Sequence, residues 1–328
     1  MSLVGIIANP SAGKDIRRIV AHGRFVPNYE KTNIIRRVLA GISATKAKKV
    51  LMMPDSAMLC HTASRDLKSN LHADLLEMQI NDDEDDSTRA ARKLAELGAS
   101  CIVTLGGDGT NRAVVKGSGQ VPLVPISTGT NNVFPYLVEG TVAGLAAGVV
   151  ASGILDIAAI TTPTKLLTVT VDGVFRDISL VDVAVSTERF IGSRAIWNMG
   201  TLHEVFLART EPDGIGLSAI GARLQVVGSN DAIGLHMRLG QGGLSVIAPI
   251  APGVVENVQV AEWAEFQVGE VMSIGISPCT IALDGERSIP IATGQLAEIG
   301  LSRDGPPVVN IAAVIRAATD LGLFTINS

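Results

Sequence analysis

Aromatic residues and cysteines are scarce in this sequence, and each shortage argues against a class of protein. Aromatic residues make up 3% of the 328 residues although hydrophobic residues make up 47%, so the cores must be filled by small and aliphatic side chains. The three cysteines, Cys60, Cys101 and Cys279, lie far apart and form no CxxC or histidine-rich pattern. This spacing argues against a disulfide framework and a structural zinc site, and we therefore expect a cytoplasmic protein.

Strong positive charge and long apolar segments are also missing. The formal net charge is −5 and no basic stripe stands out, which argues against a nucleic-acid partner. No charged segment followed by an apolar core opens the chain, so we expect no export signal. The one candidate for a membrane segment, residues 141–155, is shorter than the roughly 20 residues that span a bilayer. We expect it to form a buried helix, and we predict no membrane partner.

Strands and helices alternate along the first half of the chain, whereas short strands separated by glycine or proline dominate after Asp156. The first pattern predicts an open, Rossmann-like sheet, and the second predicts a sandwich of antiparallel sheets. The predicted fold class is therefore α/β + β, closed by a helix at residues 308–321 that returns to the first domain. The predicted domains are an α/β domain at residues 1–155, a β-sandwich domain at residues 156–305 and a C-terminal segment at residues 306–328.

The most informative run extends from Cys101 to Asn111, where an apolar strand enters a glycine-rich turn. Gly106, Gly107 and Gly109 allow positive φ and let the backbone come close to a ligand. The N–H groups of such a turn, together with the positive end of the following helix, can bind a phosphate. Asp108 at the tip would then hold Mg²⁺ or take a proton from an attacking hydroxyl. The alternative is a carboxylate that only caps the helix.

A second strand, at residues 121–126, ends in a run of small polar residues at 127–132. Ligands of open parallel sheets bind outside the carboxyl ends of the strands, so we expect both turns to contact one ligand. The two motifs, GGDGTN and PISTGTNN, resemble the superfamily of NAD kinases and diacylglycerol-type lipid kinases. They are most similar to the ATP-NAD kinase-like proteins of the AcoX type, which are associated with acetoin catabolism.

Two shorter segments extend this resemblance. The run from Asn9 to Gly13 resembles the NPxAG opening of lipid kinases and AcoX-like proteins, in which the asparagine lies beside the nucleotide. Asp284-Gly285-Glu286 resembles the lipid-kinase segment whose acid activates the attacking hydroxyl, although a plain hairpin turn would also explain it. The resemblance implies that ATP and Mg²⁺ are the cofactors.

Three hypotheses for function follow from the resemblance. The leading one is an ATP-dependent kinase that phosphorylates the ribose 2′-hydroxyl of NAD to give NADP. The second is a kinase of a lipid or another small alcohol, with Glu286 as the base. The third is a nucleotide-binding regulator of acetoin catabolism without catalysis, because the TPTGSTAY pattern and the Asn-Glu pair of NAD kinases are missing. The predicted partners are a nucleotide or dinucleotide substrate and further copies of the chain.

The predicted site residues form a catalytic set and a larger nucleotide-binding set. Asp108 and Glu286 are the predicted catalytic residues, and Asp108 is also the predicted metal ligand. We expect Asp108→Ala to abolish transfer without unfolding the protein, because a surface-loop carboxylate contributes little to packing. The predicted nucleotide-binding residues are Asn9, Gly106, Gly107, Gly109, Thr110, Asn111, Thr128, Gly129, Thr130, Asn131 and Asn132.

Overall fold

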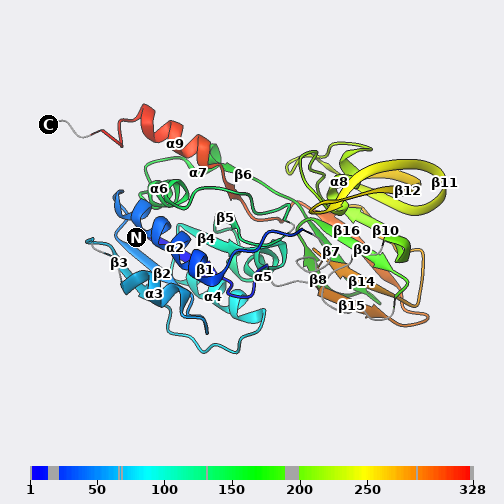
Figure 1. Ribbon diagram of the computed structural model, residues 1–328, viewed down its shortest axis with the longest axis horizontal. Coiled ribbons are helices and arrows are strands. Elements are labelled where there is room, and N and C mark those ends of the chain that lie inside the picture. The colour runs from blue at the N-terminus through cyan, green and yellow to red at the C-terminus, as the bar shows by residue number, and fades with distance from the viewer. Residues whose placement is uncertain are drawn as a thin grey trace.

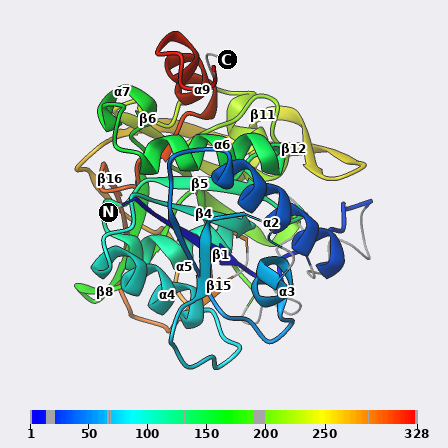
Figure 2. The same ribbon diagram turned by 90° about the vertical axis from the view of Figure 1, so that its left-hand side faces the viewer.

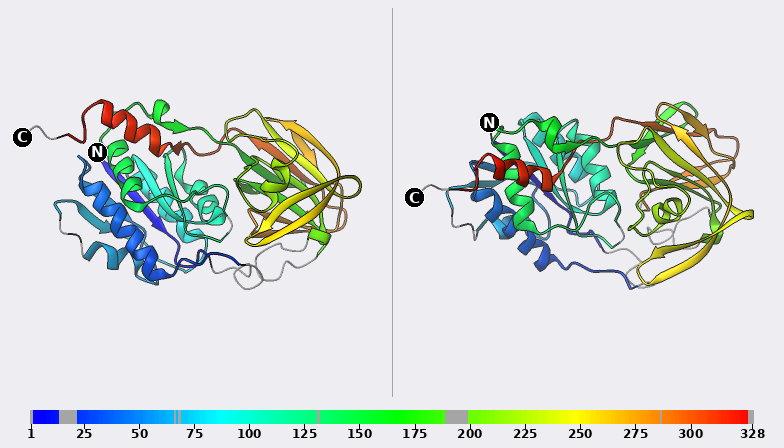
Figure 3. Two further views of the ribbon diagram at one scale, coloured as in Figure 1. Left: turned by 45° about the horizontal axis from the view of Figure 1, so that its top comes forward. Right: turned by 90° about the horizontal axis from the view of Figure 1, so that it is seen from above.

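The computed structural model describes residues 2–13, 22–65, 67, 69–130, 132–188, 199–285 and 287–325. These residues form an α/β lobe and a β lobe, joined where the chain crosses between them at residues 163–165 and 303–307 (Figure 1; Figure 3). The predicted fold class is confirmed. The limits of the predicted domains stay predictions.

A mostly parallel sheet forms the centre of the first lobe. β1 and β4 are buried along their whole length, as expected for strands that are covered by helices on both faces. All neighbours in this sheet pair in parallel except β17 and β6, which are antiparallel. Within the described residues, its order is β3 (His72–Leu75), β2 (Lys49–Met52), β1 (Leu3–Ala8), β4 (Cys101–Gly106), β5 (Leu123–Ser127), β17 (Val308–Val309) and β6 (Thr161–Thr162).

Helices cover both faces of this sheet (Figure 2). One face packs against α2 (Asn28–Ser43), α3 (Leu59–Arg65), α6 (Gly140–Ala151) and α9 (Ile311–Asp320). The other face packs against α4 (Asp85–Glu96) and α5 (Asp108–Ser118). A short helix, α7 (Ile157–Ile160), precedes β6. Helix α6 accounts for most of the predicted buried helix, and no helix in the described ranges is long and apolar enough to cross a membrane.

Helices α2 and α6 cross at a pair of glycines. A Cβ atom added to Gly144 would lie 2.1 Å from the carbonyl oxygen of Val38, and one added to Gly41 would lie 2.2 Å from that of Thr141. Both obstacles are backbone atoms, which cannot move unless the helices separate. Glycine is therefore required on both sides of this crossing.

Replacement of Gly144 by alanine is expected to lower the free energy of unfolding by about 1–3 kcal/mol, as overpacking of a close interface does. This is the net loss, after the gain of about 1 kcal/mol that alanine brings to a helix interior. Urea denaturation measures the effect, and Val142→Ala on the exposed side of α6 is the control. Equal midpoints for Gly144→Ala and the natural protein would show that the helices do not cross this closely.

The second lobe is a sandwich of two antiparallel sheets, which pack through aliphatic side chains and the edge-to-face pair Phe206 and Phe266. Over the residues described, the larger sheet has the order β12 (Val254–Gln267), β11 (Ile233–Ala251), β10 (Leu202–Leu207), β9 (Asp182–Ser186), β14 (Cys279–Leu283) and β15 (Arg287–Ile291). The smaller sheet has the order β13 (Val271–Ser273), β16 (Ala297–Ser302), β7 (Leu166–Val171) and β8 (Val174–Ser179). Helix α8 (Leu217–Ala222) packs with the long β11–β12 hairpin against the outer face of the larger sheet.

The end of the chain returns to the first lobe, as predicted, but the helix begins later than expected. Val308 and Val309 form β17, which pairs with β5 and β6 in the first sheet. Helix α9 begins after Asn310, whose side chain accepts a hydrogen bond of 3.0 Å from the N–H of Ala313. The prediction of a helix from residue 308 was wrong because the two valines fill a gap between distant strands, which the local pattern does not reveal.

Candidate functional site

Three turns meet at the carboxyl ends of β1, β4 and β5. The N–H of Asn9 donates to the carbonyl oxygen of Leu105 at 3.0 Å, which joins the end of β1 to the end of β4. The N–H of Thr128 donates to the carbonyl oxygen of Gly106, also at 3.0 Å, which joins the turn after β5 to the glycine-rich turn. The two predicted turns therefore lie side by side.

The glycines of this turn do not take positive φ, and one of them, Gly106, is required for close packing. None of Gly106, Gly107 and Gly109 has positive φ, so this part of the prediction was wrong. A Cβ atom at Gly106 would lie 2.3 Å from the Cβ of Thr110, and one at Gly129 would lie 2.6 Å from the Asn132 side chain. Gly106 is thus needed because the Thr110 side chain folds back against its backbone.

Asp108 begins helix α5 and is anchored to the turn after β5. Its Oδ1 accepts hydrogen bonds from the N–H groups of Phe134, at 2.8 Å, and Val133, at 3.1 Å, and its Oδ2 lies 3.1 Å from the same Val133 nitrogen. The residue is only 7% exposed. The description of Asp108 as a surface carboxylate was therefore wrong, because the next turn folds over it.

Several of the other predicted side chains already form hydrogen bonds within the protein. Asn111 is buried: its amide oxygen accepts from Thr104 Oγ1 at 2.7 Å, and its Nδ2 donates to the Gly107 carbonyl oxygen at 2.9 Å. Asn9 Nδ2 donates to Thr110 Oγ1 at 2.9 Å. These bonds fix the shape of the turn. Asn132 donates to Ser127 Oγ at 2.7 Å.

Two of the predicted residues present hydroxyl groups that the described part of the fold does not use. Thr128 and Thr130 are both buried, and their Oγ1 atoms have no hydrogen-bond partner within the described ranges. Gly13 lies beside them, since a Cβ atom there would be 3.1 Å from the Thr128 carbonyl oxygen. Asn131 and Glu286, a predicted nucleotide-binding residue and the second predicted catalytic residue, lie outside the described residues.

A cavity of about 510 Å³ opens beside the start of α5. Its walls come from the turn after β1, the segment after β2, the acidic segment before α4, and the first turn of α5. The first N–H groups of a helix have no partner within the helix and attract anions. The lining residues are Asn9, Pro10, Ser11, Met53, Pro54, Asp55, Ser56, Ile80, Asp82, Asp83, Glu84, Asp86, Ser87, Gly109, Thr110 and Ala113.

The far wall of this cavity is acidic, and two of its carboxylates are held in place by backbone N–H groups. Asp55 accepts from Leu59 at 2.9 Å and from Cys60 at 3.2 Å, and burial raises the pKa of its carboxyl group above the ordinary value. Asp86 accepts from Asn81 and Asp82. Carboxylates repel further phosphates but accept hydrogen bonds from sugar hydroxyls. The cavity therefore suits a nucleoside, with its phosphates at the α5 end.

Lys31 shapes the turn after β1, although its sequence context resembles that of an ordinary surface lysine on a helix. Its ammonium group is fully buried and donates to the carbonyl oxygens of Asn9, Pro10 and Ala12 at 3.1, 3.0 and 2.9 Å. A lysine ammonium has three N–H donors, so these bonds satisfy it. No local signal in the sequence marks this role, because the three carbonyl groups lie 19 to 22 residues away along the chain.

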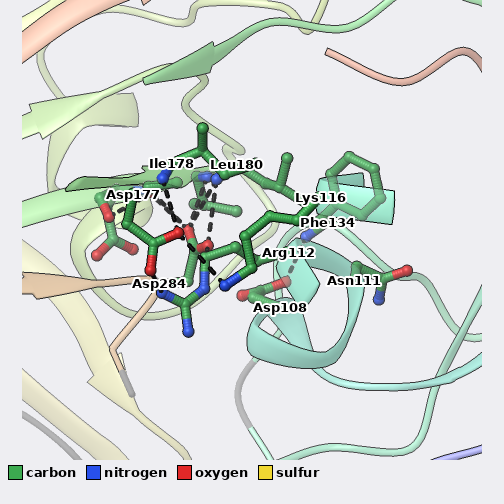
Figure 4. A network of polar contacts seen from close by, with 12 residues as sticks. Asp108, Asn111, Arg112, Lys116, Phe134, Asp177, Ile178, Leu180 and Asp284 are labelled. Atoms are coloured by element: carbon green, nitrogen blue, oxygen red, sulfur yellow. Dashed lines mark hydrogen bonds and ion pairs between the residues drawn. The ribbon is translucent and has the colours of Figure 1, made fainter. Parts of the chain in front are cut away.

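A buried ion network joins α5 to the second lobe (Figure 4). Arg112 is 1% exposed, and its guanidinium lies 3.0 Å from Glu84, 3.5 Å from Asp177 and 3.8 Å from Asp284. Lys116 Nζ lies 3.2 Å from Glu84 and 3.5 Å from Asp177. The spacing of Arg112 and Lys116, one and two helical turns after Asp108, is the signal in the sequence that could have found this network.

Asp284 has a fully buried carboxylate within this network. Its Oδ1 accepts hydrogen bonds from Ser179 Oγ at 2.6 Å, from the Val181 N–H at 2.9 Å and from the Leu180 N–H at 3.1 Å. Burial raises the pKa of its carboxyl group, while the Arg112 guanidinium and the Ser179 hydroxyl act in the opposite direction. Asp284 thus lies beside the guanidinium of Arg112, which stands one helical turn after Asp108 on α5 (Figure 4).

The acidic residues near the cavity could supply one or two ligands to a magnesium ion that is bound to phosphate. They could not supply all of its ligands. In the described part of the chain, no three histidine, cysteine or acidic side chains are grouped to hold a metal. Mg²⁺ commonly uses one or two carboxylates, with waters and phosphate oxygens as the remaining ligands. Asp108, at the start of α5, fits that pattern as a single protein ligand.

Comparison with known proteins assigns both halves of the chain. Residues 4–154 match the family model described as the ATP-NAD kinase N-terminal domain, and residues 165–304 match the acetoin catabolism protein X C-terminal domain. The crystal structure of yeast NADH kinase complexed with NADH is similar, with a TM-score of 0.51 and 17% identity, covering 99% of this chain and 89% of that one. The chain therefore has the fold of NAD kinases.

A curated relative specifies the family further. Acetoin catabolism protein X of Cupriavidus necator is 38% identical over 330 residues, which cover 96% of this chain and 92% of the relative. The chain belongs to the acetoin catabolism protein X family, which confirms the resemblance seen in the sequence. A putative diacylglycerol kinase from Bacillus anthracis str. Sterne is also similar, with a TM-score of 0.43 and 15% identity, covering 94% of this chain and 98% of that one.

Proposed function

We propose that the protein is a magnesium-dependent kinase that transfers the terminal phosphoryl group of ATP to a hydroxyl group. The arrangement that carries this proposal is the start of α5, where Gly109 and Thr110 line a nucleoside-sized cavity and Asp108 begins the helix. The N–H groups of the helix start would bind the phosphates, and the nucleoside would occupy the cavity. Mg²⁺ would neutralise phosphate charge when bound, with Asp108 as its protein ligand.

Asp108 is also the proposed base. In the transfer, the acceptor hydroxyl would lose its proton to the Asp108 carboxylate while its oxygen forms a bond to the terminal phosphorus. The bond between that phosphorus and the bridging oxygen would break, and ADP would leave. The bonds from Val133 and Phe134 would orient the carboxylate for this step. Glu286 stays a second candidate for the base.

The proposed acceptor is the ribose 2′-hydroxyl of NAD(H). The match of residues 4–154 to the ATP-NAD kinase N-terminal domain supports this choice over other alcohols. The buried Thr128 and Thr130 hydroxyls, next to the glycine-rich turn, would supply hydrogen bonds to a sugar or phosphate.

The test is to incubate the protein with ATP and Mg²⁺, with or without NAD or NADH, and to measure both ADP and the phosphorylated dinucleotide. We expect ADP release that depends on the dinucleotide, with one NADP or NADPH formed per ADP. ADP release that depends instead on diacylglycerol or glycerol would overturn the dinucleotide acceptor but keep the kinase. No acceptor-dependent release with any of these compounds would overturn the kinase itself and favour a nucleotide-binding regulator.

A further inference from the structure

Arg112 connects the wall of the cavity to a turn of the second lobe. Its Nη2 donates to Glu84, which lines the cavity, and the same guanidinium faces Asp177 and Asp284 across the boundary between the lobes (Figure 4). We infer that Arg112 is a positioning residue that couples occupation of the cavity to the placement of the Asp284–Gly285 turn. Arg112 links this turn to α5 one helical turn after Asp108, where the proposed transfer takes place.

The contacts of Arg112 differ in kind on the two sides. Its bond to Glu84, at 3.0 Å, is a hydrogen bond within the first lobe. Its Nε and Nη1 atoms have no hydrogen-bond partner in the described ranges and lie 3.8 Å from Asp284 Oδ2 and 3.5 Å from Asp177 Oδ2. Arg112 therefore attracts the two aspartates of the second lobe by charge, without a hydrogen bond to either of them. A ligand hydroxyl bound to Glu84 would weaken the first contact and let the guanidinium move toward the two aspartates.

On the other side, Asp284 cannot move without its turn. Ser179, Leu180 and Val181 donate to its carboxylate, and its own N–H donates to the Asp182 carbonyl oxygen at 3.0 Å. Its φ of +48° places it at a sharp bend directly before Gly285. A pull on the Asp284 carboxylate therefore displaces the backbone of the turn as a unit.

Asp284 also depends on Arg112 more than the other acids do. Lys116 lies within 3.5 Å of both Glu84 and Asp177, so each of these acids keeps a cation when Arg112 is removed. Arg112 is the cation that the described residues place beside Asp284. Without Arg112, the buried Asp284 carboxylate would keep only its hydroxyl and N–H partners and would have no cation beside it. We therefore expect the Asp284–Gly285 turn to change its position more than the segments that carry Glu84 and Asp177.

This inference deepens the proposed function, because it takes a nucleotide as the occupant of the cavity, but its test requires no transfer. The probe is ADP with Mg²⁺, and the readout is hydrogen–deuterium exchange in two peptides, one covering residues 105–112 and one covering residues 279–285. In the natural protein we expect ADP with Mg²⁺ to slow exchange in both.

The test variant is the double substitution Arg112→Gln with Asp284→Asn. Arg112→Gln alone leaves a buried unpaired acid, and we expect it to lower the Tm by about 6 to 20 °C. Asparagine at 284 removes that charge, retains the oxygen that accepts from Ser179 and tolerates positive φ. The double variant should regain most of the lost Tm. Arg89→Gln is the matched control, since Arg89 pairs with Asp86 on the same cavity wall but does not reach the second lobe.

The expected result is that the double variant still shows ligand-dependent slowing at residues 105–112 but none at 279–285, while Arg89→Gln shows both. If Arg112 had only a structural role, the double variant would regain its Tm and would still show slowing in both peptides. That result would overturn the coupling. Slowing at 105–112 without slowing at 279–285 in the natural protein would also overturn it and leave the kinase proposal intact. No slowing at either peptide in the natural protein would overturn both.

Discussion

Replacement of Asp108 by asparagine is expected to lower the rate of phosphoryl transfer by at least about 100-fold, the usual loss when a general base is removed. Asparagine keeps a side-chain oxygen that can accept from the Phe134 and Val133 N–H groups, so the turn should retain its shape. It cannot take a proton, and its charge no longer attracts Mg²⁺. The measurement is the initial rate of ADP formation with saturating ATP, Mg²⁺ and NAD.

Two further variants separate chemistry from folding at this position. Asp108→Ala removes the acceptor of two backbone N–H groups, and each one left unpaired when buried costs about 1–3 kcal/mol. We therefore expect Asp108→Ala to be inactive and also less stable. Asp85→Asn is the matched control, because Asp85 is an exposed aspartate at the first position of α4. A natural rate in Asp108→Asn would remove Asp108 from the mechanism.

Replacement of Lys31 by methionine is expected to weaken binding of ADP with Mg²⁺ at least ~10-fold, which corresponds to about 1.4 kcal/mol. The carbonyl groups of Asn9, Pro10 and Ala12 lose the ammonium that holds them in place, and the cavity loses the defined shape of that wall. The free energy of unfolding should also fall by about 1.5–3 kcal/mol, as for a lost hydrogen bond to a charged group. Titration calorimetry and urea denaturation measure the two effects.

Lys49→Met is the control for Lys31→Met, because Lys49 is an exposed lysine on β2 in the same lobe. It should change neither affinity nor stability beyond about 0.5 kcal/mol. If Lys31→Met binds ADP with unchanged affinity, the turn after β1 keeps its shape without the lysine, or the nucleotide does not contact that turn.

The turns after β4 and β5 could be predicted from the sequence because short local patterns mark them. A buried strand followed by glycine and small polar residues marks the carboxyl end of a parallel strand, so the turns after β4 and β5 could be placed before the structure was known. Their juxtaposition follows from the parallel sheet order. The wrong prediction of positive φ arose because glycine has two uses, and the local sequence does not distinguish close packing from an unusual backbone conformation.

The parts that the sequence could not predict depend on contacts between distant residues. Lys31 and Arg112 lie on helices, where a basic side chain is usually solvated. Lys31 is buried because it binds carbonyl groups 19 to 22 residues away along the chain. Arg112 is buried because it faces Asp284 in the second lobe. The same holds for β17, whose two valines become a strand only because β5 and β6 leave a place between them.

We propose that the turns after β1, β4 and β5 form one phosphate-binding site at the start of α5. A crystal structure of the protein with ADP and Mg²⁺ tests it most directly. We expect the phosphates at the N–H groups of Gly109 and Thr110, with the nucleoside against the acidic wall. Nucleotide bound instead in the apolar cavity of about 760 Å³ that Phe134, Tyr136, Ile311 and Ile315 help to line would contradict it.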